Sequence, residues 1–429
     1  MKKAILFFPE ITSEQNQYPT GLYKIASYCS SEYDIFVLDA RIDKNFYDVL
    51  SYFLENNDVL CLGVSVMTGQ QIKGALEVSK KYHGKVPIVW GGVFPTTLPK
   101  QVISHPEIDY IILGDGEKTF LNLLRYLDNK PCENLFANKH NNNYEIHFAD
   151  INNKEYVNFS KYPVNKQYLI SRDGFQNAFT IETSRGCPHR CGFCHNTSIN
   201  RPYRYIEAEN VIAIIDKISK MMHIDGIIFQ EDNFFLKKDR VTKIIEFLIT
   251  NSCIGWKANS RINYFKSLIY DETFMSKIVE SRCHVLQFGI ESGSENIQKM
   301  INKNINIGDV ISINREFSKY NIKLRYNFMI GFPCETREDM NLTFKLIDTL
   351  QSENNNVEPP FLNIYTPYPG TPLYNLACQK GFVPPESLQG WADLNWNSSV
   401  LPWFSREENF FIEKSSREYF DRSKYLRSR

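Results

Sequence analysis

The chain has 429 residues, 43% of them hydrophobic, which is enough for two or three domains with well-buried cores. Its 49 lysine and arginine residues balance 49 aspartate and glutamate residues, and this balance argues against a nucleic-acid-binding surface. No apolar stretch is long enough to span a bilayer, and the first apolar run stops at Pro9 without a signal-peptide cleavage site. We therefore expect a cytoplasmic protein.

Short apolar runs alternate with amphipathic stretches over residues 1–150. Gln71–Tyr82, for example, places its apolar residues at nearly helical spacing. This alternation predicts a doubly wound, Rossmann-like α/β domain, whose ligands bind beyond the carboxyl ends of its parallel strands. The five expected strands are Ala4–Phe8, Asp34–Asp39, Val59–Val66, Val86–Gly92 and Tyr110–Leu113.

Glycine-rich runs follow three of these strands, and each run alone is a weak signal. Glycines at strand ends let the backbone approach a large flat or phosphorylated ligand closely. The candidate residues are Ser65, Met67, Thr68 and Gly69 after the third strand, Gly91, Gly92, Val93 and Phe94 after the fourth, and Gly114 and Glu117 after the fifth.

Three cysteines, Cys187, Cys191 and Cys194, lie within eight residues of each other. Structural zinc usually takes two separated pairs of ligands, and no second pair follows. An iron–sulfur cluster takes four cysteines, so three would leave one iron without a protein ligand. A zinc site completed by His189 or His195, or a chance group of structural thiols, is the alternative. The other seven cysteines are scattered, as in a reducing cytosol.

Strand and helix patterns then repeat over residues 176–380, after an expected linker over residues 151–175. Six such units predict a partial (β/α) barrel of the TIM type, with active residues on the loops at the carboxyl ends of the strands. The expected strands are Phe179–Ser184, Gly226–Glu231, Gly255–Ser260, Val285–Glu291, Leu324–Gly331 and Phe361–Tyr365.

The cysteine loop, with Phe193 just before its last cysteine, resembles the cluster loop of the radical S-adenosylmethionine (SAM) superfamily. The runs at successive strand ends resemble most closely the subgroup of this superfamily that carries a cobalamin-binding domain, and the resemblance covers most of residues 1–380. It implies a [4Fe-4S] cluster on Cys187, Cys191 and Cys194, SAM on the open iron, and cobalamin at the ten glycine-run residues named above.

The chemical groups of SAM then suggest partners at the strand ends of the barrel. Glu231 or Asp232 would accept from the ammonium group, and Arg261 would pair with the carboxylate. The remaining candidates are Ser260 and Glu291 for the ribose hydroxyls, and Phe193, Ile330, Gly331 and Tyr365 for the adenine.

The chain departs from the subgroup at several positions. It lacks the Asp-x-His-x-x-Gly motif, since its first histidine is His83. Phe94 stands where the subgroup often has histidine, and Cys334 stands where it usually has glycine. A first domain that has lost cobalamin therefore remains an alternative.

The resemblance implies an enzyme that uses an external one-electron reductant of the flavodoxin or ferredoxin type. Its expected reaction is methylation of an unactivated carbon in a small or natural-product-type substrate. Cyclisation or another carbon-skeleton reaction is the alternative within the subgroup. An iron–sulfur regulator without catalytic activity is the alternative from another class.

Residues 381–429 lose periodicity and gain aromatic side chains, which predict a cap on the barrel mouth or the lining of a substrate pocket. Residues 417–429 are basic and predict a solvated helix. The aromatic residues are Trp391, Trp396, Trp403, Phe404, Phe410 and Phe411.

Overall fold

The computed structural model describes residues 1–10, 17–152, 156–251, 253–394 and 401–427, and the chain forms two compact units. The first unit comprises Met1–Tyr168 with Pro384–Asn395, and the second comprises Leu169–Val383 with Trp396–Arg429. Residues 384–394 therefore fold with the first unit, although they follow most of the second in sequence. The predicted aromatic residue Trp396 lies outside the described residues.

The first unit is built on a mainly parallel sheet with the order β2-β1-β3-β4-β5-β6. The five predicted strands are present, and β6 adds a short antiparallel partner to β5. The strands are β1 (Lys3–Phe8), β2 (Asp34–Asp39), β3 (Val59–Ser65), β4 (Ile88–Gly91), β5 (Tyr110–Ile112) and β6 (Ala137–Asn138).

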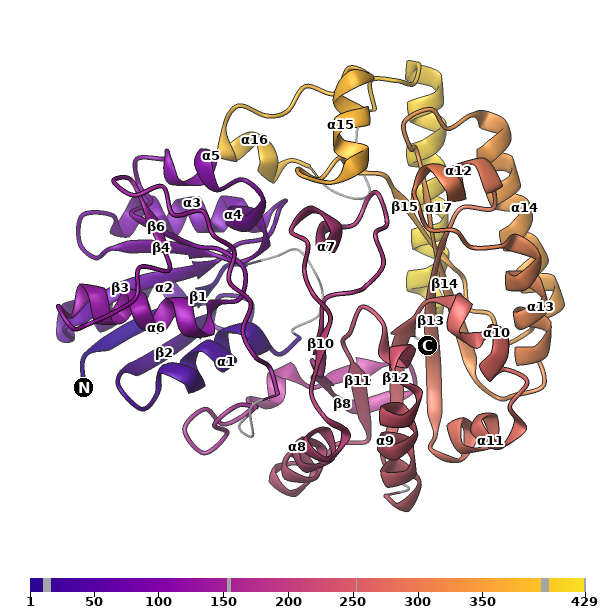
Figure 1. Ribbon diagram of the computed structural model, residues 1–429, viewed down its shortest axis with the longest axis horizontal. Coiled ribbons are helices and arrows are strands. Elements are labelled where there is room, and N and C mark those ends of the chain that lie inside the picture. Colours follow the sequence, from indigo (N-terminus) through magenta and orange to yellow (C-terminus); the bar gives the residue numbers. More distant parts are fainter. Residues whose placement is uncertain (11–16, 153–155, 252, 395–400, 428–429) are drawn as a thin grey trace. The chain divides into compact units, whose positions relative to one another are not determined.

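Helices cover both faces of this sheet, so the predicted doubly wound fold is confirmed (Figure 1). Helices α1 (Thr20–Cys29) and α6 (Gly116–Leu127) pack together on one face. Helices α2 (Phe46–Asn56) and α3 (Gln71–Tyr82) lie on the other face. They are joined by Tyr82 of α3, whose hydroxyl donates to the carbonyl of Tyr47 in α2 at 3.0 Å. Short helices α4 (Val93–Thr97) and α5 (Pro99–Ile103) follow β4, and α16 (Leu388–Ala392) packs on α3.

The second unit is a curled half-barrel sheet with the order β15-β14-β13-β12-β11-β8-β7. Six strands are parallel, as predicted, and the short strand β7 pairs antiparallel with β8. The strands are β7 (Ile170–Arg172), β8 (Phe175–Ile181), β11 (Gly226–Phe229), β12 (Gly255–Ser260), β13 (Cys283–Glu291), β14 (Lys323–Ile330) and β15 (Phe361–Ile364).

Aromatic side chains join the outer face of the half-barrel to its helices. The ring of Phe288 on β13 lies 5.3 Å from that of Phe265 in α10 and 6.0 Å from that of Phe317 in α13. The outer face is therefore the hydrophobic core of this unit. Its helices are α8 (Ala208–Met221), α9 (Lys238–Thr250), α10 (Phe265–Leu268), α11 (Glu272–Glu280), α12 (Glu295–Met300), α13 (Ile307–Phe317), α14 (Arg337–Glu353) and α15 (Pro372–Gln379).

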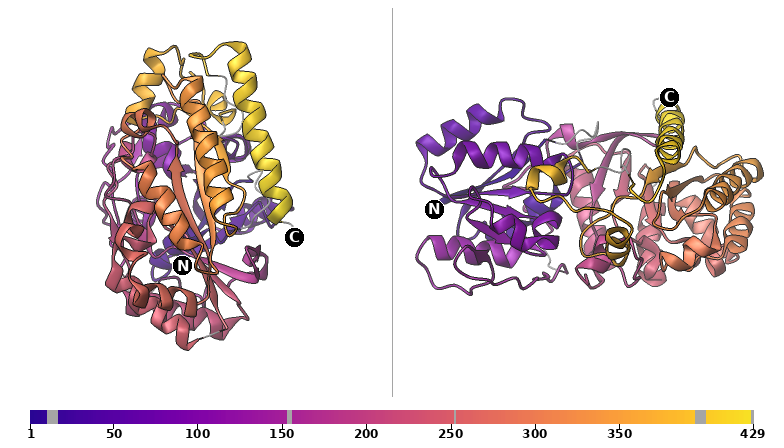
Figure 2. Two further views of the ribbon diagram at one scale, coloured as in Figure 1. Left: turned by 90° about the vertical axis from the view of Figure 1, so that its right-hand side faces the viewer. Right: turned by 90° about the horizontal axis from the view of Figure 1, so that it is seen from above.

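Helix α17 (Arg406–Arg427) packs along the edge strand β15, as the yellow helix in Figure 2 shows. Ile412 is fully buried, and the Ser416 hydroxyl donates to the Leu362 carbonyl at 2.7 Å. These contacts cover a strand edge that would otherwise be exposed. Further along the helix, Arg417, Glu418, Asp421 and Arg422 are exposed, in keeping with the solvated helix expected from residue 417. Neither α17 nor any other described helix combines the length and apolar character needed to cross a membrane.

Gly226 on β11 has no room for a side chain, because an added Cβ would overlap the ring of Phe175. We expect Gly226→Ala to lower the free energy of unfolding by about 1–3 kcal/mol through overpacking. Gly21 in α1 is the matched control, since nothing lies within 4 Å of the place of its Cβ. Gly21→Ala should leave stability unchanged or raise it by at most about 1 kcal/mol, measured by chemical denaturation. Equal effects at the two glycines would contradict this account.

Candidate functional site

The loop that carries the three cysteines is closed at its neck by a two-stranded sheet. Strand β9 (Ser184–Arg185) pairs antiparallel with β10 (Arg204–Tyr205), on either side of the loop. Gly186 has a positive φ of 79°, and a side chain there would collide with the Pro202 carbonyl. Glycine is therefore required where the loop begins.

The middle of the loop is held by backbone hydrogen bonds. The Gly192 N–H donates to the Ile301 carbonyl at 2.7 Å, and the Leu373 N–H donates to the Gly192 carbonyl at 3.0 Å. Within the loop, the Cys194 N–H donates to the Cys191 carbonyl at 3.1 Å. The residue after α12 and the first turn of α15 therefore fix the position of the cysteines.

The chemistry of the loop fits a cluster better than a single ion. Among the described residues, no three potential metal-ligating side chains lie close enough together to hold one metal ion. A four-iron cluster binds each thiolate at a different iron, so its ligands stand further apart than those of one zinc ion. His189 is engaged elsewhere, with its Nε2 2.9 Å from the Tyr264 hydroxyl. Burial raises the pKa of Cys194 to about 12, so binding of iron must displace a proton.

Glu231, a candidate for the SAM ammonium, is buried beneath the neck of the cysteine loop. Its carboxylate accepts from the hydroxyls of Thr183 and Ser184, and Arg240 Nη2 lies 3.4 Å away. Burial raises the pKa of Glu231, although Arg240 opposes the shift. These contacts tie Glu231 to the support of β9.

Asp232, the alternative candidate, is exposed beside the cysteine loop. Its Oδ2 accepts from Asn196 Nδ2 at 2.8 Å, two residues after Cys194. Of the two neighbouring carboxylates, Asp232 is thus the one that a ligand at the cysteines can reach.

The structure brings Phe193, Arg261 and Glu291 together around Lys303, a residue that the sequence analysis missed. Lys303 Nζ forms an ion pair with Glu291 and lies 5.6 Å from the centre of the Phe193 ring. Arg261 Nη1 lies 3.3 Å from Cys191 Sγ, and its Nη2 donates to the Lys303 carbonyl. Lys303 lies in an irregular stretch after α12, so no periodicity or spacing marked it.

Three of the adenine candidates, Phe193, Gly331 and Tyr365, lie in or beside one buried apolar cluster. Tyr365 belongs to a buried apolar cluster against which Phe193 packs, and its hydroxyl has no partner among the described residues. Trp403 lies 6.1 Å from Tyr365 between ring centres and donates to the Gly331 carbonyl at 3.2 Å. Ile330, the fourth adenine candidate, is fully buried in β14. Ser260, a candidate for the ribose hydroxyls, donates to Asn233 Oδ1 at 3.3 Å.

Glu335 fixes the turn that follows β14. Its Oε2 accepts from the N–H groups of Gly331 and Phe332, the latter at 3.0 Å, while its Oε1 is buried without a partner among the described residues. Burial raises the pKa of Glu335 to about 8, even though these two N–H groups favour the charged form. The sequence analysis did not select this residue.

The inner face of the half-barrel carries polar side chains on several strands. Residues paired directly in a parallel sheet share a face, and Asn259 pairs with Gln287, Gly289 with Asn327, and Met329 with Asn363. Asn327 Oδ1 and, on β8, Thr180 Oγ1 are buried without a hydrogen-bond partner among the described residues. Such atoms cost stability unless a ligand satisfies them.

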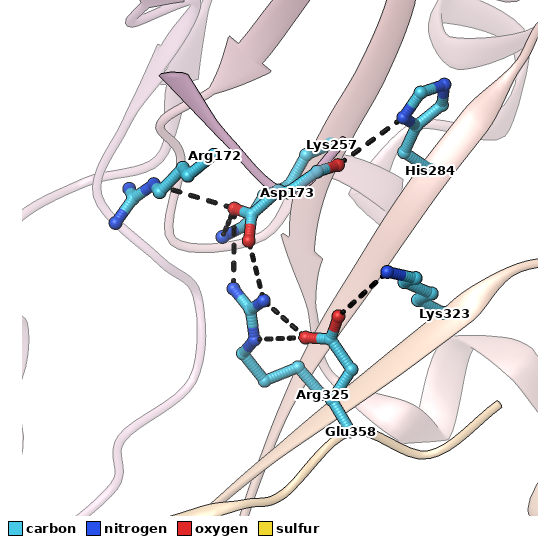
Figure 3. A network of polar contacts seen from close by, with 7 residues as sticks. All are labelled: Arg172, Asp173, Lys257, His284, Lys323, Arg325 and Glu358. Atoms are coloured by element: carbon cyan, nitrogen blue, oxygen red, sulfur yellow. Dashed lines mark hydrogen bonds and ion pairs between the residues drawn. The ribbon is translucent and has the colours of Figure 1, made fainter. Parts of the chain in front are cut away.

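An ion-pair network closes the amino end of this inner face (Figure 3). Asp173, in the turn between β7 and β8, accepts from Lys257 Nζ at 2.9 Å and from Arg325 Nη2 at 2.7 Å. Arg325 Nε also donates to Glu358 Oε2 at 3.0 Å. Although burial favours the neutral acid, Lys257 and Arg325 hold the pKa of Asp173 below its ordinary value. The network is paired throughout, as buried charges require.

In the first unit, several of the residues in the glycine-rich runs pack closely against other backbone atoms of the same unit. The φ of Gly92 is 104°, and a Cβ there would lie 2.8 Å from the Val66 carbonyl oxygen. A Cβ at Gly114 would collide with the His147 carbonyl, because the segment around His147 covers the end of β5. Phe94 is fully buried. At these positions the close approach that we expected towards a ligand is made to protein atoms.

The ends of β3 and β4 fit a large amide-bearing ligand better. Met67 is 56% exposed, and Ser65, Thr68, Gly91 and Val93 are half-buried. Gln71 is only 2% exposed; its Oε1 accepts from the Met67 N–H at 2.7 Å, while its Nε2 has no partner among the described residues. Gly69 and Glu117 are buried. The free Gln71 donor suits the acceptor-rich amide and phosphate groups of cobalamin, and no sequence signal singled it out.

Comparison with known proteins agrees with both halves of this description. Residues 11–124 match the B12 binding domain, and residues 181–347 match the radical SAM superfamily. The solved cobalamin-dependent SAM radical enzyme OxsB superposes with a TM-score of 0.73 at 17% identity, covering 98% of this chain and 67% of that one. The chain belongs to the radical SAM enzymes that carry a cobalamin-binding domain.

Its curated relatives include methyltransferases and a cyclase. An uncharacterized methyltransferase of Pyrococcus horikoshii is 25% identical over 418 residues, which are 95% of this chain and 89% of the relative. A bacteriochlorophyllide d C-8(2)-methyltransferase of Chlorobaculum tepidum is 22% identical over 392 residues, 89% of this chain and 80% of the relative. An anaerobic magnesium-protoporphyrin IX monomethyl ester cyclase of Rubrivivax gelatinosus is 22% identical over 320 residues, 70% of this chain and 54% of the relative.

The buried carboxyl of Glu335 makes stability depend on pH. In the folded protein the Glu335 carboxyl stays protonated up to about pH 8. In the unfolded chain it loses this proton near its ordinary pKa of 4.5. Between these values the folded state binds more protons, so stability should fall as pH rises, by at most about 1.4 kcal/mol per pH unit. Glu335→Gln should remove this slope in urea denaturation at pH 5, 6.5 and 8. Glu338→Gln, an exposed control, should keep it; a wild-type slope in Glu335→Gln contradicts the account.

Proposed function

We propose that this protein is a cobalamin-dependent radical SAM methyltransferase that methylates a carbon atom of a small molecule. The observation that carries the proposal is the anchored three-cysteine loop at the carboxyl edge of a half-barrel, in a chain whose first unit matches the B12 binding domain. When bound, the cluster and SAM supply the radical that removes a hydrogen atom, and cobalamin supplies the methyl group.

The side chains of the second unit support specific roles. Cys187, Cys191 and Cys194 would hold the cluster. Asp232 would accept from the SAM ammonium, since its carboxylate is exposed beside the loop while Glu231 is buried. Arg261 and Lys303 offer cations for the SAM carboxylate.

Aromatic side chains would complete the SAM site. Phe193, Tyr365 and Trp403 provide flat apolar surfaces for the adenine, close to the Gly331 backbone that Glu335 fixes. These aromatic rings would also keep water away from the radical.

The inner face of the half-barrel supports a substrate rich in hydrogen-bonding groups. Amide side chains line it, and the unpartnered atoms of Thr180 and Asn327 would meet polar groups of the substrate. Two relatives named above act on large, flat tetrapyrroles. The polar inner face favours a more polar substrate for this protein.

A cyclase is the second candidate, because a cyclase is among the relatives. Both reactions begin with cleavage of SAM to 5′-deoxyadenosine, but only a methyltransferase also converts SAM to S-adenosylhomocysteine while it remethylates cobalamin. Formation of both products from one preparation would favour methyl transfer, and 5′-deoxyadenosine alone would favour the cyclase.

The function is tested on protein prepared without oxygen from cobalamin-fed cells and assayed for iron, sulfide and cobalt. Wild-type protein should contain all three and release 5′-deoxyadenosine with SAM and a reductant. Replacing Cys187, Cys191 or Cys194 with alanine should remove iron and abolish this product. Cys378→Ala, a half-buried thiol of the same unit, should change neither. The assignment of the cluster to these three cysteines would be refuted if only the Cys378 variant lost iron, or if the wild-type protein contained no iron.

The buried hydroxyl of Thr180 on β8 allows a test of stability that needs no substrate. Thr180→Val should raise the free energy of unfolding by about 1 kcal/mol, because the buried hydroxyl has no partner in the part of the chain that the structure describes. Thr343 is the matched control: it is equally buried, but its hydroxyl accepts from the Gly293 N–H at 3.0 Å and donates to the Asp339 carbonyl at 3.2 Å. Thr343→Val should destabilise by about 1–3 kcal/mol. Equal destabilisation in urea denaturation would show that Thr180 has a structural role.

A further inference from the structure

Residues 384–394 cross the first unit as a separate segment, here called the strap, that contains α16. It packs on α3, although the second unit lies between the two in sequence. The contacts that the strap makes within the first unit lie beside the loops that follow β3 and β4.

Trp391 is the main apolar contact of the strap. It is 1% exposed, and its ring centre lies 6.4 Å from that of Phe94, in the first turn of α4 directly after β4. Its indole N–H donates to Gln101 Oε1 at 3.0 Å. The same amide donates through Nε2 to the carbonyls of Pro385 and Glu386, at 3.0 and 2.8 Å. Gln101 therefore fastens the strap at both of its ends.

A second set of contacts reaches the loop after β3. Asp393 forms an ion pair with Lys73, in the first turn of α3, at 2.8 Å. The Leu394 carbonyl oxygen lies 3.2 Å from the place that a Cβ on Gly69 would take, and Gly69 has a positive φ of 103°. The strap thus packs closely on the loop after β3, at a position whose positive φ favours glycine.

We propose that the strap is a positioning element of the cobalamin site, and that Trp391 and Gln101 are its positioning residues. The proposal rests on cobalamin binding by the first unit. In and beside the loops after β3 and β4 lie Met67, Gly91 and Gln71, whose Nε2 has no partner among the described residues; these features best fit the cofactor. By holding Phe94 and Gly69, the strap orders both loops before cobalamin arrives.

The physical basis is preorganisation. A loop that is disordered before binding loses conformational entropy when it closes on a ligand, and this loss weakens affinity. Phe94 is fully buried against Trp391, so it contributes through the position of its loop. A segment beyond the half-barrel in sequence would then control how tightly the first unit holds its cofactor.

The test measures the dissociation constant for hydroxocobalamin, by absorbance titration of the full-length chain. Trp391→Ala and Gln101→Ala should weaken binding at least tenfold, while circular dichroism and the iron content of the second unit stay at wild-type values. Trp391→Phe, which keeps a buried ring, should restore most of the affinity. Trp256→Ala is the matched control: Trp256 is as buried as Trp391 and its indole also donates a hydrogen bond, to Ser281 Oγ at 3.0 Å, but within the second unit, so cobalamin affinity should not change.

The outcomes separate the two proposals. Wild-type affinity in both Trp391→Ala and Gln101→Ala would overturn the role of the strap and leave the cobalamin enzyme intact. Wild-type protein that binds no hydroxocobalamin would overturn the proposed function, and the strap proposal with it. If Trp391→Ala fails to fold, Gln101→Ala alone decides, because Gln101 is only half-buried and its loss removes hydrogen bonds without opening an apolar core.

Discussion

Parallel strand pairing is the constraint on which the rest of this protein depends. Strands that run in one direction need a crossover between each pair, so all their carboxyl ends meet at one edge of the sheet. In the second unit this edge gathers the cysteine loop, Asp232 and Arg261 from three different crossovers, and Glu291 from the end of β13. In the first unit it gathers the loops after β3 and β4. Residues far apart in sequence thereby become one site.

The half-barrel separates its two faces by chemistry. The outer face buries aromatic rings against helices, whereas the inner face carries amides above a paired network of charges. Buried charge is tolerated at Asp173 because Lys257 and Arg325 satisfy it. The buried hydroxyl of Thr180 has no such partner among the described residues, and an unsatisfied polar group that lowers stability is a common feature of a ligand-binding site.

Local patterns predicted most elements well, because periodicity and strand length are properties of neighbouring residues. Asp34–Asp39, Gly255–Ser260 and Gln71–Tyr82 have the bounds expected from the sequence. Short antiparallel strands such as Ile170–Arg172 were missed, since three residues hold no period and their pairing depends on a distant partner. The packing of Arg406–Arg427 on a strand edge was missed for the same reason.

The sequence by itself determined the kind of chemistry: cysteine spacing, strand-end glycines and the order of the motifs identified the family and its cofactors. Only the tertiary structure decided which candidate residues are available to them. It placed Glu231 in a buried network and Asp232 at the surface, and it brought Lys303 beside Glu291. It also placed Trp391, which follows the half-barrel in sequence, in the first unit. Such outcomes depend on burial and long-range packing, which no short stretch of sequence encodes.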